Sequence, residues 1–333
     1  MDKLEIDAAE LKAVNELLDA FEGEFGQLDS DQALHRATVL AHQLPHRIRL
    51  YLNAFRLGQL AGVLCISGYQ VDQERVGPTP AHWRERPFPS TAHREELLLI
   101  LYGSLLGDPF SWATQQDGRL IHDVLPIQGH ENEQLGSSSE ALLTWHTEDA
   151  FHSLRGDFLS FACLRNPYRA ATTVGYADAM DLPESVKDVL FQERFVIRPD
   201  QAHTAKNNYV PGTEIFEGIE QMQNNPDRVA VLFGDPNQPY IRADPYFMAV
   251  AGGDEEAQGA LDELVKTMDE LMFDVRLESG DFCFLDNFRV VHGRKPFKAR
   301  HDGTDRWLKR INITSDLRKS RAARGSDELR AIR

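Results

Sequence analysis

The stretch Val-Arg-Leu-Glu-Ser-Gly-Asp-Phe-Cys-Phe-Leu-Asp-Asn-Phe-Arg-Val-Val-His-Gly-Arg, residues 275–294, contains short apolar segments separated by turn-forming residues. Ser279-Gly280-Asp281 predicts a tight turn, residues 282–285 predict a strand, and a second turn leads into a strand that carries His292. Two short strands separated by turns are typical of the wall of a β-sandwich or barrel. The stretch therefore predicts a β-rich fold with a histidine on one of its strands.

A His-x-Glu pair, His146 and Glu148 in Trp-His-Thr-Glu-Asp-Ala, lies far upstream of His292. In an extended strand, residues i and i+2 point to the same side, so both side chains can reach one ion. Two imidazoles and one carboxylate leave coordination positions open, as in non-haem Fe(II) oxygenases. The pair alone would indicate a solvated strand face, because the chain has twelve histidines. Its context with His292 favours a metal site.

Composition limits the class of protein. The chain has 333 residues, of which 42% are hydrophobic and 9% aromatic, as expected for a folded globular protein. A net charge of −16 argues against a nucleic-acid partner, which requires a positively charged surface. The basic residues near the C-terminus (318–324) are short in extent and predict a solvated tail.

The expected compartment is the cytoplasm. The N-terminal residues lack the basic and apolar regions of a secretory signal, and no apolar run is long enough to cross a bilayer. Cys65, Cys163 and Cys283 are odd in number, lack CxxC spacing and lie in apolar surroundings. We expect them to be small buried hydrophobes rather than disulfide partners or zinc ligands.

Hydrophobic periodicity predicts helices early in the chain and short strands later. The predicted helices are 8–25 (with Asp7 as N-cap), 31–42, 45–60, 95–107, 183–193 and 254–273. The predicted strands are 61–69, 118–126, 157–164, 171–177, 229–234, 239–243 and 281–293. Residues 197–218 are polar and exceed an ordinary connection in length, which favours a lid.

These elements predict a mainly β fold with flanking helices and a double-stranded β-helix, or jelly-roll, core. We expect one oxygenase domain over residues 1–333. Its expected parts are a helix-rich portion (1–110), the jelly-roll core with its lid (111–315) and a basic tail (316–333).

Several sequence blocks resemble the clavaminate-synthase-like branch of the Fe(II)/2-oxoglutarate oxygenases, which includes arginine and asparagine hydroxylases. The similarity extends from about Leu44 to Arg321. The blocks that carry it are 112–119, 123–127, 145–151, 191–195 and 302–314.

The resemblance implies that His146, Glu148 and His292 bind Fe(II). It also implies that Arg306 and Thr173 hold the cosubstrate 2-oxoglutarate, with Thr172 as the alternative to Thr173. Arg310 would bind the substrate α-carboxylate. The substrate amine would lie near Gln115 and Glu148, and a distal cation would meet Asp244, with Asp200 as a partner from the lid.

Each of these residues also has an ordinary structural alternative. Arg306 and Arg310 could be surface cations, Gln115 a buried amide that satisfies the backbone, and Asp244 a turn residue before proline. One departure concerns the acidic position: the arginine hydroxylase pattern is Asp-x-Asp, whereas this chain has Asp244-Pro245-Tyr246. Two carboxylates suit the fork of a guanidinium, whereas one carboxylate with a phenol could serve an ammonium or a differently placed guanidinium.

The implied function is oxidation of a free cationic L-amino acid, most simply C3 or C4 hydroxylation, with 2-oxoglutarate and O2 as cosubstrates. L-arginine is the first expected substrate, and specialised-metabolite biosynthesis, such as that of an antibiotic, is the expected setting. Lysine or another polar amino acid, or desaturation of arginine, are alternatives within this class. A non-catalytic jelly-roll metal-binding protein is the alternative from another class.

Overall fold

The stretch 275–294 forms two strands that belong to different sheets. The computed structural model describes residues 1–25, 28, 31–208, 214–324 and 330–333. β14 (Phe282–Asp286) lies in an eight-stranded sheet, and β15 (Val290–Arg294) lies in a four-stranded sheet. Gly280 has φ +91°, and a Cβ there would lie 1.9 Å from the carbonyl oxygen of Tyr69. The predicted turn therefore requires glycine at this position.

The large sheet has the order β1-β2-β14-β6-β16-β3-β17, and β4 also pairs with β16. β16 is central, because it pairs with β6, β3 and β4. The strands other than β14 are β1 (Asp2–Glu5), β2 (Val63–Ser67), β3 (Asp108–Trp112), β4 (His122–Val124), β6 (Phe158–Arg165), β16 (Trp307–Thr314) and β17 (Ala331–Ile332).

The small sheet has the order β13-β7-β15-β5. Its strands other than β15 are β5 (Leu143–His146), β7 (Thr172–Tyr176) and β13 (Phe273–Val275). Apolar side chains from both sheets form one buried cluster, with Phe161 and Leu308 from the large sheet and Val174 and Val290 from the small sheet. Two sheets that enclose a common core form the predicted jelly roll.

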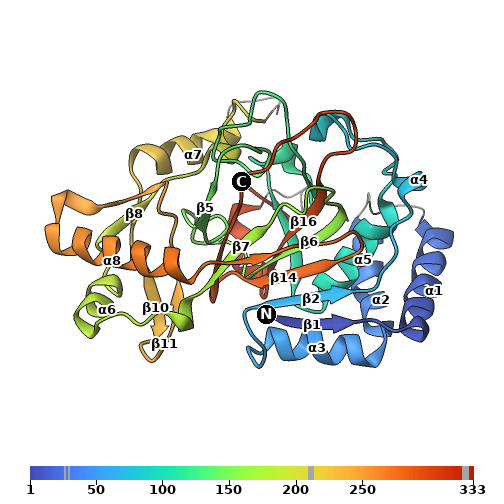
Figure 1. Cartoon of the computed structure of the whole chain (residues 1–333), viewed down its shortest axis with the longest axis horizontal. Coiled ribbons are helices and arrows are strands. Elements are labelled where there is room, and N and C mark those ends of the chain that lie inside the picture. Colours follow the sequence, from blue (N-terminus) through green and yellow to red (C-terminus); the bar gives the residue numbers. More distant parts are fainter. Residues whose placement is uncertain (26–27, 29–30, 209–213, 325–329) are drawn as a thin grey trace.

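Helices cover the outer face of the large sheet, at the right of Figure 1. They are α1 (Ala8–Phe25), α2 (Asp31–Leu40), α3 (His46–Arg56) and α5 (His93–Ser104), with the short α4 (Gln73–Val76) nearby in the chain. α5 is buried along most of its length because it packs on β6, β3 and β16. The Asp7 carboxylate accepts hydrogen bonds from the backbone N–H groups of Ala9 and Glu10, which confirms the predicted N-cap.

A second apolar cluster lies at the left of Figure 1, around α6 and α8. Val291 and Trp145 of the small sheet contribute to this cluster. The elements here are α6 (Glu184–Leu190), α7 (Glu214–Asn224), α8 (Glu255–Leu271), β8 (Phe195–Ile197), β9 (Arg228–Val229), β10 (Leu232–Asp235), β11 (Gln238–Ile241) and β12 (Met248–Val250).

The fold class is confirmed, but several local predictions were wrong. Glu148 lies in a turn after β5, which ends at His146. The segment 197–218 is not a continuous loop, because it contains a 3-10 turn (Gln201–His203) and the start of α7 at Glu214. Residues 209–213 of the predicted lid lie outside the described residues. The predicted helix 254–273 ends at Leu271, and residues 229–234 include parts of two strands.

The C-terminal segment is also more ordered than a solvated tail. A 3-10 helix spans Leu317–Ala323, and Ser320 within it is buried. Ile332 pairs with Trp112 in the parallel β17–β3 ladder and packs against Phe110 and Trp112. Apolar side chains after the basic stretch explain the difference, since they bury against the sheet.

The three cysteines are buried and free. Cys65 on β2 lies directly opposite Cys283 on β14, and both belong to the core cluster that also contains Cys163. None of the helices in the described parts of the chain combines the length and apolar character that crossing a membrane requires.

Candidate active site

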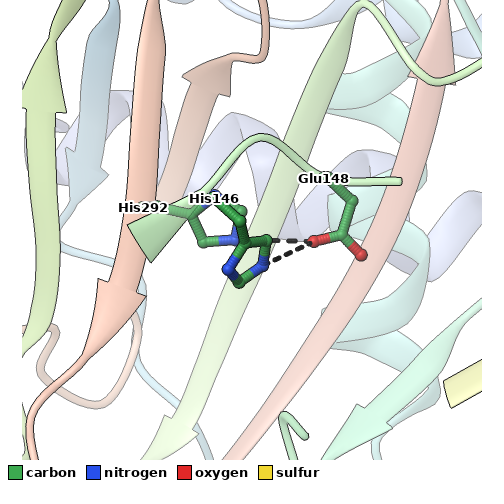
Figure 2. A group of neighbouring side chains, drawn as sticks. All are labelled: His146, Glu148 and His292. Atoms are coloured by element: carbon green, nitrogen blue, oxygen red, sulfur yellow. Dashed lines mark ion pairs between the residues drawn. The ribbon is translucent and has the colours of Figure 1, made fainter. Parts of the chain in front are cut away.

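Strand register brings the two predicted histidine ligands together. β15 pairs antiparallel with β5, and His292 lies directly opposite His146. Directly opposed side chains in an antiparallel pair project from the same face of the sheet. Figure 2 shows both imidazoles turned toward the Glu148 carboxylate.

Asn287 holds the turn that carries Glu148. Its side-chain oxygen accepts from the Glu148 backbone N–H at 2.7 Å, and its side-chain nitrogen donates to the carbonyl oxygens of Glu148 and Gly156. Asn287 is buried and lies in the β14–β15 connection. The opening stretch of sequence thus supplies both a histidine and the anchor for the carboxylate opposite it.

The three side chains form a compact donor set. Glu148 Oε2 lies 3.8 Å from His146 Nε2 and 3.4 Å from His292 Nε2. One potential metal-ligand atom from each of the three residues lies within 4.8 Å of the other two. His146 Nδ1 donates to the Thr144 carbonyl oxygen at 2.9 Å, which leaves Nε2 available to a metal. Two imidazole nitrogens and one carboxylate on one side suit a ferrous ion.

Glu148 is a buried carboxylate that stays ionised. Burial opposes its charge, but the neighbouring Arg310 guanidinium and hydrogen bonds with both imidazoles hold the pKa of Glu148 well below its usual range. Arg310 Nη1 forms an ion pair with Glu148 Oε1. The oxygen that faces the histidines is therefore Oε2, so the carboxylate is arranged to bind a metal through one oxygen.

Arg306 is a buried cation without an acidic partner among the described residues. It is 5% exposed, and its Nε has no hydrogen-bond partner there. Burial lowers the pKa of Arg306 to about 10. Burying a guanidinium without a carboxylate partner costs free energy, so an anionic ligand would stabilise the folded protein. The fit to a carboxylate of 2-oxoglutarate rests on this unpaired charge.

Thr172, rather than the favoured Thr173, lies on the pocket side of β7. Thr172 pairs with Arg294, and Val174 pairs with His292, so these four residues share one face. Thr172 lines the pocket with Arg306. Thr173 is opposite Gly293, and its side chain faces away from His292. The geometry therefore favours the alternative threonine.

Arg310 and Gln115 form one end of the pocket. Arg310 Nη2 donates to Gln115 Oε1 and to His122 Nδ1, each at 2.8 Å. Burial, with the nearby Arg310 charge, holds the pKa of His122 well below its usual value, so its imidazole is neutral and accepts through Nδ1. Arg310 is thereby fixed in orientation by partners on both sides.

Two carboxylates lie elsewhere on the pocket wall. Asp244 is buried, and burial raises its pKa to about 6, with the negative charge of Asp200 contributing in the same direction. Asp244 Oδ1 accepts from the backbone N–H groups of Tyr246 and Phe247. Asp244 therefore also stabilises a turn, as the structural alternative predicted. Burial likewise raises the pKa of Asp200. A cation placed between these carboxylates would relieve their mutual repulsion.

The predicted site residues other than Thr173 line one pocket, which has about 780 Å³ of empty space including its opening to solvent. The predicted residues in its wall are Gln115, His146, Glu148, Thr172, Asp200, Asp244, His292, Arg306 and Arg310. His146, Thr172, His292 and Arg310 lie on strands of the two sheets, and the other residues lie in turns and connections beside those strands.

Sequence reasoning missed several supporting residues. Asn287 clamps the Glu148 turn, and His122 orients Arg310. Arg294 is buried and donates to the Ser138 hydroxyl and to the Ser139 and Ala141 carbonyl oxygens. His203 is wholly buried beside the pocket. Asn287 carries the clearest signal, since a polar amide between two buried strands usually fixes a connection.

Comparison with known proteins defines the class. Residues 86–312 match the taurine catabolism dioxygenase TauD/TfdA family, and with relatives that span its whole length, the chain belongs to this family of dioxygenases.

Two curated relatives are enzymes that hydroxylate amino acids, to judge by their names. The chain is 44% identical to an L-ornithine/L-arginine 3-hydroxylase of Catenulispora acidiphila over 100% of both chains. It is 43% identical to an enduracididine beta-hydroxylase of Streptomyces hygroscopicus over 97% of both chains. The solved non-haem iron oxygenase OrfP, with Fe, succinate and (3S)-hydroxy-L-Arg, superposes with a TM-score of 0.95 at 44% identity, and both chains are covered fully.

These comparisons confirm the predicted class: a 2-oxoglutarate-dependent, non-haem iron dioxygenase with a jelly-roll core that acts on small molecules. They name no residue of this chain. The roles of individual side chains therefore remain proposals that rest on the geometry described above.

Proposed function

We propose that this enzyme hydroxylates a free cationic L-amino acid, with L-arginine as the first candidate. The observation that carries the proposal is the charge pattern of the pocket, with Arg310 at one end and Asp244 and Asp200 elsewhere on its wall. Such a pocket complements a molecule with an α-carboxylate at one end and a cation at the other. Relatives that act on arginine and ornithine support this choice.

His146, Glu148 and His292 would hold the ferrous ion, and Arg306 with Thr172 would hold the cosubstrate. When bound, iron and 2-oxoglutarate together with O2 supply the oxidising power that replaces a C–H bond with C–OH. The Arg306 guanidinium would bind a cosubstrate carboxylate, because it is buried without an acidic partner among the described side chains.

Arg310 and Gln115 would orient the amino-acid end of the substrate. Arg310 would bind the α-carboxylate, and Gln115 and Glu148 would lie near the amine. His122 and Gln115 already hold Arg310 Nη2, so little further ordering is needed on binding. A substrate fixed at both ends presents one part of its side chain to the metal, which would select the oxidised carbon.

Asp244 would meet the distal cation. Tyr246, two residues later, carries a phenol in place of a second carboxylate and is 56% exposed. One buried carboxylate accommodates a guanidinium or an ammonium, which keeps ornithine and lysine as candidates after arginine. The similarity to an enduracididine hydroxylase adds a cyclic guanidine to the guanidinium class.

We also propose that residues 1–333 act as one catalytic unit in the cytoplasm, in specialised metabolism such as antibiotic biosynthesis. Three free, buried thiols are typical of a reducing compartment. In the helix-rich portion β1 pairs with β2, and β2 pairs with β14, so the expected divisions share one sheet.

The test is an anaerobically prepared Fe(II) enzyme given 2-oxoglutarate, O2 and each amino acid in turn, with succinate and product mass measured. We expect substrate-dependent succinate release and a mass gain of one oxygen with arginine. Loss of two hydrogens would instead identify a desaturase, and preference for lysine would correct the substrate. Iron binding without turnover of any amino acid would support the non-catalytic alternative.

A further inference from the structure

A buried polar network lies beside the pocket, next to the proposed metal ligands. His203 is wholly buried, with its Nε2 3.0 Å from Asp149 Oδ1 and its Nδ1 2.8 Å from the Thr114 hydroxyl. Its ring also packs against Trp112 and Phe151, at centroid distances of 5.6 and 4.9 Å. Both ring nitrogens and the ring edge are therefore engaged by the sheet and the turn after β5.

Asp149 is equally well engaged. Its Oδ2 accepts from Trp112 Nε1 at 2.6 Å and from Asn312 Nδ2 at 3.3 Å, while Oδ1 faces His203. Asp149, Asp200 and His203 lie close enough to suggest a second metal site. A metal would have to displace these hydrogen bonds, so the contacts favour a structural fastening over a metal site.

His203 belongs to a segment, residues 200–208, that folds on itself. Asp200 Oδ1 accepts from the Ala202 backbone N–H at 2.7 Å. The Asn208 side chain donates to the carbonyl oxygens of Ala202 and Thr204, and Asn207 donates to that of Gln201. These bonds keep the segment compact, whereas His203 ties it to the β-sheet core.

The segment also forms part of the pocket wall, because Asp200 and Ala202 line it. A carboxylate oxygen of Asp200 lies within 4.8 Å of a ring nitrogen of His203. Although burial opposes its charge, the hydrogen bond with Asp149 and the charges of Asp200, Asp149 and Glu148 raise the pKa of His203. The charged imidazole of His203 would thus attract the nearby carboxylates of Asp149 and Asp200.

We propose that His203 is a positioning residue, which fastens residues 200–208 to Asp149 and thereby sets the Asp200 carboxylate over the substrate pocket. His203 would not touch the substrate. It would act through Asp200, which meets the distal cation in the function proposed above, and this part of the inference rests on that function. The fastening itself does not depend on which substrate is bound.

The central variant is His203→Phe, which keeps an aromatic ring against Trp112 and Phe151 but removes both ring nitrogens. We expect KM for arginine to rise about tenfold, equivalent to about 1.4 kcal/mol, because the variant loses the hydrogen bond with the charged Asp149 that holds the segment in place. KM for 2-oxoglutarate should stay unchanged, and iron should remain at one equivalent per chain. His203→Gln, which retains a donor toward Asp149, should recover part of the loss.

The matched control is His152→Phe. His152 also packs on Trp112, with ring centroids 4.6 Å apart, but its Nδ1 accepts from the Leu154 backbone within its own turn. This variant should leave both KM values near those of the wild type. An equal rise of KM for arginine in both variants would mean that packing on Trp112, not fastening of the segment, explains the effect, and would overturn the proposal.

A second pair of variants tests whether His203 acts through Asp200. Asp200→Asn should raise KM for arginine but change KM for the neutral analogue citrulline little. If His203 works by placing Asp200, adding His203→Phe to Asp200→Asn should raise KM for arginine little further. Effects that multiply in full would show independent roles and overturn the proposal.

Hydrogen exchange separates this inference from the proposed function. In the substrate-free protein, His203→Phe should speed amide exchange in residues 201–208, while the exchange of β6 and β16 stays slow. Wild-type protein that converts no amino acid would overturn the proposed function but leave this measurement valid. Unchanged exchange in residues 201–208 would overturn the fastening role whatever the substrate.

Discussion

Glu148 connects the metal site with the substrate site, because one oxygen faces two histidines and the other pairs with Arg310. Replacing Glu148 with alanine should abolish tight Fe(II) binding, since two imidazoles alone hold a ferrous ion weakly. His146→Ala should act in the same way, and the exposed His42→Ala serves as the control. Iron content after gel filtration and succinate release measure the effect. Full iron content and turnover in both site variants would exclude these residues as ligands.

Arg306 is the residue most specialised for an anion. Arg306→Lys retains the charge but loses the planar fork, so we expect KM for 2-oxoglutarate to rise at least about thirtyfold, equivalent to about 2 kcal/mol. KM for the amino acid should change little. The exposed Arg318→Lys is the control for loss of a guanidinium. An equal rise of KM for 2-oxoglutarate and for the amino acid would instead indicate a folding defect, which circular dichroism would detect.

Asp244 should decide the preference for a cationic side chain. Asp244→Asn keeps the size of the side chain and its hydrogen bonds to the Tyr246 and Phe247 backbone, but removes the charge. We expect kcat/KM to fall about tenfold or more for arginine and to change little for citrulline. An unchanged ratio between the two substrates would assign recognition of the cation to other groups.

At the scale of the element, β14 ends at Asp286, whose negative charge is disfavoured by burial, directly before the anchor Asn287. Burial raises the pKa of Asp286 to about 6 from an unfolded value of 3.8. A raised pKa means that the protonated form is favoured in the folded protein. Its contribution to stability is complete below about pH 4 and is lost as the pH rises through about 6.

Asp286→Asn should therefore stabilise the protein at pH 8, by up to about 3 kcal/mol, and have little effect below about pH 4. Asparagine can still accept the hydrogen bond that the Phe288 backbone N–H donates. Urea unfolding at both pH values measures the difference, and the exposed Asp188→Asn is the control. A gain of equal size at both pH values would show that charge burial is not its cause.

Local chemistry explains which elements could be predicted from sequence. The turn at Gly280 and the strands around it follow from residues within ten positions of each other. β16 was missed because Lys309 and Arg310 interrupt its apolar pattern. Lys309 is nevertheless wholly buried, since Asp123 and Glu96 from distant elements supply its partners.

The candidate site shows the same division between local and distant information. His146, Glu148, His292 and Arg306 could be selected because their types and spacing match a known chemistry. The choice between Thr172 and Thr173 could not be made, because it depends on which face of β7 meets His292. The link between His203 and Asp149 joins residues 54 positions apart and leaves no pattern in the sequence.

At the scale of the whole molecule, the C-terminal strand supports the site from behind. Ile332 is 1% exposed and packs with Trp112, whose indole donates to Asp149 beside Glu148. Ile332→Ala should cost about 2–5 kcal/mol of unfolding free energy and lower turnover, whereas Ile332→Val should cost about 0.5–1.5 kcal/mol. Chemical denaturation measures both. Wild-type stability of the alanine variant would mean that β17 docks without contributing to the fold.

The placement of the three cysteines has a consequence for an enzyme that brings iron and O2 together. Escaped peroxide attacks thiolates in preference to thiols, and burial raises the pKa of both Cys65 and Cys163 to about 12 and the pKa of Cys283 well above its usual value. Cys65 and Cys283 also face each other across neighbouring strands inside the core, where oxidants do not reach them. We therefore expect the three thiols to stay reduced during turnover and oxidative self-damage to fall on exposed side chains instead.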